Sequence, residues 1–177
     1  MNLIHKTNEI TIKGIIDCDT VNYKKISLVI EFPYCTFKCD KECGKNVCQN
    51  SALVSAENKK VLIDNIINSY YIPNLITEAI ICQGLEPFDS WSELVSLIDK
   101  VRNEYKINDD IVIYTGYTEE ELKHKTFGEY NLISYLKTFY SNIIIKFGRY
   151  IPDQEYHFDD ILGVNLASDN QYAKKIS

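Results

Sequence analysis

The sequence predicts an α/β protein with mostly parallel strands, because apolar runs suited to buried strands alternate with amphipathic helical segments. Three of these runs end in glycine, and Gly84, Gly116 and Gly148 recur every 32 residues, close to the length of one strand–loop–helix unit. Near-continuous apolar strands are typical of a parallel sheet with covered faces. We therefore expect a parallel-stranded open sheet or partial (β/α) barrel, in a single domain over residues 1–177.

The N-terminal half should supply the first strands and crossover helices. Ser55 is suited to cap a helix that runs to about Tyr71. The capping box at Ser90–Glu93 predicts the start of a second helix, whose apolar face extends to Tyr105. The strands expected in this half cover residues 9–16, 26–32 and 78–84.

The C-terminal half repeats the alternation. A capping box at Thr118–Glu121 predicts a helix that breaks near Gly128 and resumes to about Tyr140. The strands expected here cover residues 111–116, 142–148 and 161–166. Because loops at the carboxyl ends of parallel strands converge, we expect one shared rim. The segments expected there are 34–50, 84–89, 115–117 and 148–150.

The net charge, the apolar runs and the cysteines limit the classes of partner and the compartment that we expect for this protein. The net charge of −6 argues against a nucleic-acid or anionic-membrane partner, since both attract basic surfaces. We find neither a signal-peptide pattern at the N-terminus nor an apolar run long enough to cross a bilayer, so a cytoplasmic protein is expected. In that reducing compartment, clustered cysteines indicate metal ligands or redox groups rather than disulfides.

Four of the six cysteines, Cys35, Cys39, Cys43 and Cys48, lie in a loop over residues 33–50 that directly follows an apolar strand. Structural zinc sites usually present two close cysteine pairs separated by a longer gap, which this spacing does not show. Short, thiolate-rich loops of this kind favour an iron–sulfur cluster, and a four-cysteine zinc module stays the alternative. We call residues 33–50 the cluster loop.

Four further motifs stand out in the chain: Phe-Pro-Tyr-Cys35, Gln83-Gly-Leu-Glu-Pro-Phe88, the segment from Ile111 to Leu122 and Ser168-Asp-Asn-Gln171. Together with the cysteine spacing, they resemble the radical S-adenosylmethionine superfamily. Within it, the chain is similar to the activating proteins of anaerobic ribonucleotide reductase, over roughly residues 10–173. The resemblance implies the superfamily's partial (β/α) barrel, a [4Fe-4S] cluster and S-adenosylmethionine as cofactor.

The cluster loop departs from the superfamily's Cys-x3-Cys-x2-Cys pattern, and this leaves the third ligand open. Cys35 and Cys39 match the first two positions. We prefer Cys48 as the third, because Val47 before it matches the apolar position beside the adenine, with Cys43 as the alternative. The implied catalytic set is therefore Cys35, Cys39 and Cys48.

The resemblance also implies which residues hold S-adenosylmethionine. The segment Gly84-Leu85-Glu86-Pro87 is similar to the superfamily's Gly-Gly-Glu-Pro motif, in which the glutamate accepts from the amino group. Leu85 replaces the second glycine. Further candidates for ribose or carboxylate contacts lie at strand ends and in the tail: Tyr114, Thr115, Asn165 and Ser168.

The activity implied is reductive cleavage of S-adenosylmethionine to a 5′-deoxyadenosyl radical. The partner implied is a glycyl-radical enzyme, the anaerobic ribonucleotide reductase, with a small electron-transfer protein as reductant. A radical enzyme that acts on a small molecule is the second hypothesis. The four-cysteine zinc module, used for binding, is the third.

Overall fold

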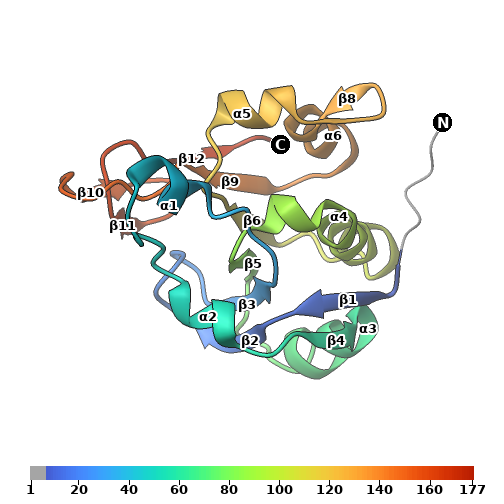
Figure 1. Ribbon diagram of the computed structural model, residues 1–177. Coiled ribbons are helices and arrows are strands. Elements are labelled where there is room, and N and C mark those ends of the chain that lie inside the picture. The colour runs from blue at the N-terminus through green and yellow to red at the C-terminus, as the bar shows by residue number, and fades with distance from the viewer. Residues whose placement is uncertain (1–6) are drawn as a thin grey trace.

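The computed structural model describes residues 7–177 and is built on a six-stranded sheet of order β12-β9-β6-β5-β3-β2 (Figure 1). The four inner strands are parallel, and the two edge strands, β2 and β12, run antiparallel to their neighbours. The strands are β2 (Gly14–Asp19), β3 (Ser27–Phe32), β5 (Ala79–Gly84), β6 (Asp110–Tyr114), β9 (Ile143–Phe147) and β12 (Tyr172–Lys175). The predicted α/β class is confirmed, with a largely parallel sheet that does not close into a barrel within residues 7–177.

The inner strands form because their apolar runs are buried on both faces. In β3, Leu28, Ile30 and Phe32 pack in the larger apolar core, whereas Val29 joins a smaller cluster. This alternation follows from the two-residue period of a strand. All five residues of β9 are buried, as expected for a central position in a covered sheet.

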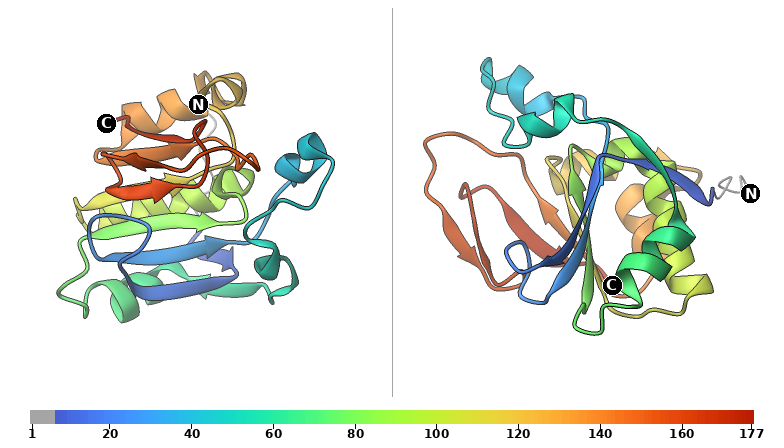
Figure 2. Two further views of the ribbon diagram at one scale, coloured as in Figure 1. Left: turned by 90° about the vertical axis from the view of Figure 1, so that its left-hand side faces the viewer. Right: turned by 90° about the horizontal axis from the view of Figure 1, so that it is seen from below.

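Helices cover one face of the sheet, on the side of the larger core (Figure 2, right). The Thr118 capping box is formed, and the helical segment after it breaks at a short hairpin around Gly128 before it resumes, both as predicted. The elements are α3 (Ile63–Ile66) with η1 (Ile67–Tyr71), α4 (Trp91–Asp99) with η3 (Lys100–Glu104), α5 (Glu119–His124), β7 (Thr126–Phe127), β8 (Tyr130–Asn131) and α6 (Leu132–Phe139).

The opposite face carries the smaller apolar cluster and a hairpin of β10 (His157–Asp159) and β11 (Val164–Leu166). The hairpin and the helices lie on opposite sides of the sheet, and the cluster loop stands beyond the strand ends (Figure 2). That loop contains α1 (Lys38–Cys43) and leads into α2 (Ser51–Ser55). A short 3-10 helix, η2 (Pro87–Ser90), follows β5.

Three expected elements differ from those in the structure, and one strand was not expected. The strand over 9–16 is two strands, because β1 (Glu9–Ile12) leaves the main sheet to pair with β4 (Lys59–Leu62). The helix expected from Ser55 therefore begins at Ile63, after that pairing. The expected strand 161–166 contains only β11, because residues 160–163 form the hairpin turn, and the sequence analysis did not predict β12.

The capping box predicted at Ser90–Glu93 is also wrong. Ser90 makes no side-chain cap, and its Oγ lacks a partner among the described residues. The Oε1 atom of Glu93 instead accepts a hydrogen bond of 3.1 Å from the backbone N–H of Thr11. No helix within residues 7–177 combines the length and the apolar character needed to span a membrane.

Candidate iron–sulfur and cofactor site

A cavity of about 350 Å³ lies at the carboxyl ends of the parallel strands. Its wall includes the three strand-end glycines, the β10–β11 hairpin and part of the cluster loop. The predicted common rim is therefore present, since parallel strands deliver their loops to one edge of the sheet. The lining residues used below are Cys35, Cys39, Val47, Cys48, Gly84, Leu85, Glu86, Tyr114, Thr115, Lys146, Arg149 and Asn165.

Asp40 folds the cluster loop back on itself. The helix α1 ends at Gly44, which adopts the left-handed conformation with φ of 68°. The Oδ1 atom of Asp40 accepts hydrogen bonds from the backbone N–H groups of Val47 and Cys48, at 2.8 and 2.9 Å. These bonds return residue 48 to the start of α1, so Cys48 lines the same cavity as Cys39.

Three of the four loop thiols share the cavity wall. Cys35, Cys39 and Cys48 line it, whereas Cys43 is exposed and does not. Burial raises the pKa of Cys35 to about 12, and burial together with the charges of Cys48 and Asp40 raises that of Cys39. Among residues 7–177, no three Cys, His, Asp or Glu side chains form a ready group of metal ligands. The donor chemistry, three thiols on one partly buried wall, fits a thiolate-ligated cluster.

Two hydrogen bonds attach the cluster loop to β5 and to η2, the short helix that follows β5. The Nδ2 atom of Asn50 donates to the carbonyl oxygen of Gly84 at 2.6 Å, and the N–H of Thr36 donates to Oδ2 of Asp89 at 3.0 Å. Gly84 has φ of 103°, and a Cβ there would lie 2.6 Å from the backbone nitrogen of Phe32. Position 84 therefore requires glycine, because the chain both turns and packs tightly there.

Glu86 is the buried acid of the cavity. It is only 4% exposed, and its carboxylate accepts from Phe88 N–H at 3.1 Å, Thr115 Oγ1 at 2.8 Å and Gly116 N–H at 2.9 Å. Burial raises its pKa to about 7, although these hydrogen bonds oppose the shift. The carboxylate is thus fixed in place and lines the space next to the cysteines.

Lys146 is a site residue that is not among the candidates predicted from the sequence. It lies on β9 within an otherwise apolar run, is 7% exposed and lines the cavity. Its Nζ donates to the carbonyl oxygen of Gly148 at 2.8 Å. Burial lowers its pKa to about 8, which the charge of Glu86 partly offsets. The sequence signal that could have identified Lys146 as a site residue is its position inside an otherwise apolar strand.

The remaining candidates divide between the cavity and its surroundings. Leu85, Tyr114 and Asn165 line the cavity, and the hydroxyl of Tyr114 donates to the carbonyl oxygen of Asn22. Pro87 and Ser168 do not line it. Pro87 begins η2, and the Oγ of Ser168 donates to Oδ1 of Asn170 at 2.7 Å.

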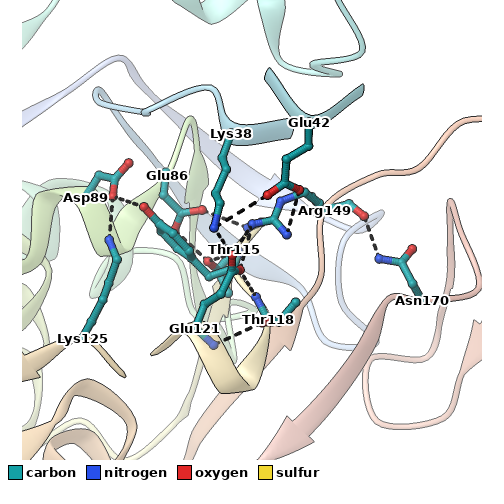
Figure 3. A network of polar contacts seen from close by, with 12 residues as sticks. Lys38, Glu42, Glu86, Asp89, Thr115, Thr118, Glu121, Lys125, Arg149 and Asn170 are labelled. Carbon is teal, nitrogen blue, oxygen red and sulfur yellow. Dashed lines mark hydrogen bonds and ion pairs between the residues drawn. The ribbon is translucent and has the colours of Figure 1, made fainter. Parts of the chain in front are cut away.

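Charged residues connect α1 to the strand ends (Figure 3). Nη2 of Arg149 donates to both carboxylate oxygens of Glu121, at 2.8 Å each. Glu121 also pairs with Lys38, and Arg149 lies 3.4 Å from Glu42. Lys38 and Glu42, one helical turn apart on α1, lie 3.7 Å from each other. We call Lys38, Glu42, Glu121 and Arg149 the charge quartet.

The three thiols on the wall of a cavity at the strand ends are suited to an iron–sulfur-binding class of protein. The family described as 4Fe-4S single cluster domain matches residues 25–158, and the chain belongs to that family. The matched span includes the whole cluster loop, Glu86 and Lys146. The iron–sulfur interpretation of the loop is thereby confirmed at the level of the family. No curated protein and no solved structure matches the chain.

Proposed function

We propose that this protein is a radical S-adenosylmethionine enzyme that cleaves its cofactor reductively beside the cluster loop. The observation that carries the proposal is the shared cavity, which places three thiols, a buried carboxylate and a buried lysine around one space. When bound, a [4Fe-4S] cluster supplies the electron that splits the sulfonium into methionine and a 5′-deoxyadenosyl radical. Cys35, Cys39 and Cys48 would hold such a cluster with three thiolates, and the cofactor would supply the remaining ligand.

Cys35, Cys39 and Cys48 are the residues proposed to hold the cluster. Their support is that they line the cavity, whereas the Cys43 thiol is exposed away from it. The return of Cys48 by the Asp40 hydrogen bonds makes residues 40–47 an insertion between ligands rather than an interruption of the site. Val47, which also lines the cavity, offers the apolar neighbour expected for the adenine.

The remaining cavity residues suit a zwitterionic cofactor. The ionised carboxylate of Glu86 is proposed to accept from the amino group of S-adenosylmethionine, and Lys146 to pair with its carboxylate. Thr115 and the Gly116 N–H hold Glu86 in position at 2.8 and 2.9 Å, so little reorganisation is required on binding. The volume of about 350 Å³ lies within the range of small-molecule sites.

The superfamily's partial barrel is part of this proposal. The cavity lies at the carboxyl ends of four parallel strands and is bordered by the β10–β11 hairpin on the face without helices. An incomplete barrel with its site on the inner, open side has this arrangement.

The hydrogen donor proposed is a backbone glycine of an anaerobic ribonucleotide reductase, with a small electron-transfer protein as reductant. A hydrogen atom passes from the glycine Cα to the 5′ carbon, which gives 5′-deoxyadenosine and a glycyl radical on the partner. The support is the motif resemblance, above all the segment from Ile111 to Leu122, which forms β6, its cavity-facing end and the start of α5.

Anaerobic reconstitution of the wild type and four single cysteine-to-alanine variants tests the cofactor chemistry. We expect the wild type to bind iron and sulfide and to release 5′-deoxyadenosine from S-adenosylmethionine under a strong reductant. Loss of both properties is expected for the alanine variants of Cys35, Cys39 and Cys48 and retention for Cys43→Ala. A zinc-loaded protein that leaves S-adenosylmethionine intact would overturn the proposal.

Electron spin resonance on mixing with purified anaerobic ribonucleotide reductase tests the hydrogen donor. We expect a glycyl radical signal that needs the reductant, S-adenosylmethionine and the wild-type chain together. Cleavage without a glycyl signal, accompanied by consumption of a metabolite, would replace this donor with a small molecule.

A further inference from the structure

The helix α1 of the cluster loop contributes no residue to the apolar core. None of the six residues of α1 is buried, so burial of apolar surface cannot fix the position of this helix. Yet Cys39 must keep its place on the cavity wall next to Cys35 and Cys48. Polar contacts must therefore hold α1 in place. The charge quartet connects α1 to α5 and to the segment that follows β9 (Figure 3).

The quartet forms a closed ring of alternating charge. Going around it, Lys38 pairs with Glu121, Glu121 with Arg149, Arg149 with Glu42, and Glu42 with Lys38. The two α1 members are half-exposed, whereas the side chains of Arg149 and Glu121 are 13% and 24% exposed. Each ion pair in such a network contributes more to stability than an isolated surface pair, because each charged side chain is already held in position by another partner.

Glu121 and Arg149, the two members of the quartet outside α1, are themselves held in place by hydrogen bonds. Glu121 is the third residue of α5 and accepts from the Thr118 N–H at 2.9 Å as part of the capping box. Arg149 follows β9, and its carbonyl oxygen accepts from Nδ2 of Asn170 at 2.9 Å. Burial disfavours the charged form of Glu121, but hydrogen bonds from Lys38, Thr118 and Arg149 bring its pKa down to about 2. The carboxylate therefore stays ionised at neutral pH.

We propose that Glu121 and Arg149 are positioning residues that hold α1, and with it Cys39, on the cavity wall through Lys38 and Glu42. This inference deepens the proposed function, since it assumes that the loop holds the cluster. It does not depend on radical chemistry. Glu121 lies outside the cavity lining and Arg149 is part of it, and the role proposed for both is the placement of the helix.

Hydrogen exchange of the full-length chain, before and after anaerobic reconstitution, tests this proposal. The informative variant is Glu121→Gln, because glutamine keeps the hydrogen-bond acceptor of the capping box and removes the charge. We expect amides of residues 37–44 to exchange about fivefold faster than in the wild type, the effect of about 1 kcal/mol of lost pairing. Iron release to a chelator should accelerate in the same variant.

Glu120→Gln is the matched control. Glu120 lies on the same helix, but its side chain is 70% exposed, and its ion pairs within residues 7–177 are with Lys123 and His124. It should leave α1 exchange and iron release unchanged. Lys38→Met should reproduce the effect of Glu121→Gln, and the double variant should add little, because both changes remove the same pair.

Two results would overturn the inference. One is α1 exchange and iron release in Glu121→Gln equal to those in wild type. The other is faster exchange of α5 amides to the same degree as α1, which would mean that Glu121 acts on its own helix. Both readouts work without S-adenosylmethionine or a partner, so a wrong proposed function and a wrong positioning role give different results.

Discussion

In the inner strands, apolar side chains are buried on both faces of the sheet, whereas the helix of the cluster loop buries none of its six residues. The strands are held in place by apolar side chains that are buried away from water. The loop is fixed by the hydrogen bonds that Asp40 accepts and Asn50 donates, and by the charge quartet. One chain therefore combines a scaffold that is stabilised by apolar burial with a site that is stabilised by polar and charged contacts. We expect different perturbations to destabilise the scaffold and the site.

The largest effect is expected in the scaffold. Phe147 on β9 is fully buried, and Phe147→Ala should lower the free energy of unfolding by about 3–5 kcal/mol, through lost burial and the cavity left behind. Urea unfolding measures the change. Phe158→Ala is the control, since this residue is 59% exposed and its loss should cost far less. Equal losses in both variants would contradict a scaffold held by apolar burial.

Sequence reasoning succeeded where local pattern decides structure. The apolar runs of β3, β5, β6 and β9 and the Thr118 capping box are local signals, and all were predicted. The helix expected from Ser55 failed because Val61 and Leu62 fit a helical stripe, while their true role depends on pairing with β1, some 50 positions away. Long-range pairing leaves no trace in a local apolar period.

The candidate site shows the same division. The common rim follows from parallel topology and was predictable, as was the concentration of thiols beside Glu86. The charge quartet was not, because Lys38 and Glu121 are 83 positions apart and each reads as an ordinary surface charge. The choice of Cys48 over Cys43 stays a prediction, since lining a cavity is not ligation.

The second prediction concerns the junction between strand and loop. Gly84→Ala places a Cβ against the backbone of Phe32 at a φ of 103°, and should cost about 3 kcal/mol of stability. Gly128→Ala is the control, because φ is 60° there and no atom lies within 4 Å of the added Cβ, so only about 1 kcal/mol of strain is expected. Thermal or urea unfolding separates them. A smaller loss at position 84 than at 128 would contradict the close packing.

The third prediction concerns the buried acid at that junction. Because the pKa of Glu86 rises from 4.5 to about 7 on folding, the native state holds a proton between these pH values that the unfolded chain releases. Stability contributed by this group is therefore greatest at low pH and falls as pH rises through that window. Glu86→Gln lacks this dependence.

Urea unfolding at pH 4.5 and 7.5 measures the linkage for Glu86. The difference in stability between Glu86→Gln and the wild type should move in favour of the variant by on the order of 2 kcal/mol over this interval. A constant difference at both pH values would show that folding does not shift the titration of Glu86.

The smallest effect is expected at the exposed edge of the quartet. Glu42 is half-exposed and 3.4 Å from Arg149, so Glu42→Gln should change the free energy of unfolding by less than about 0.5 kcal/mol. The change should appear instead as slightly faster hydrogen exchange in α1, and added salt should remove the difference from wild type, because salt screens an exposed pair. A loss of global stability as large as that of Phe147→Ala would erase the distinction between scaffold and loop. A local, salt-sensitive effect would sharpen it, because it would show that α1 can loosen while the sheet beneath it stays folded.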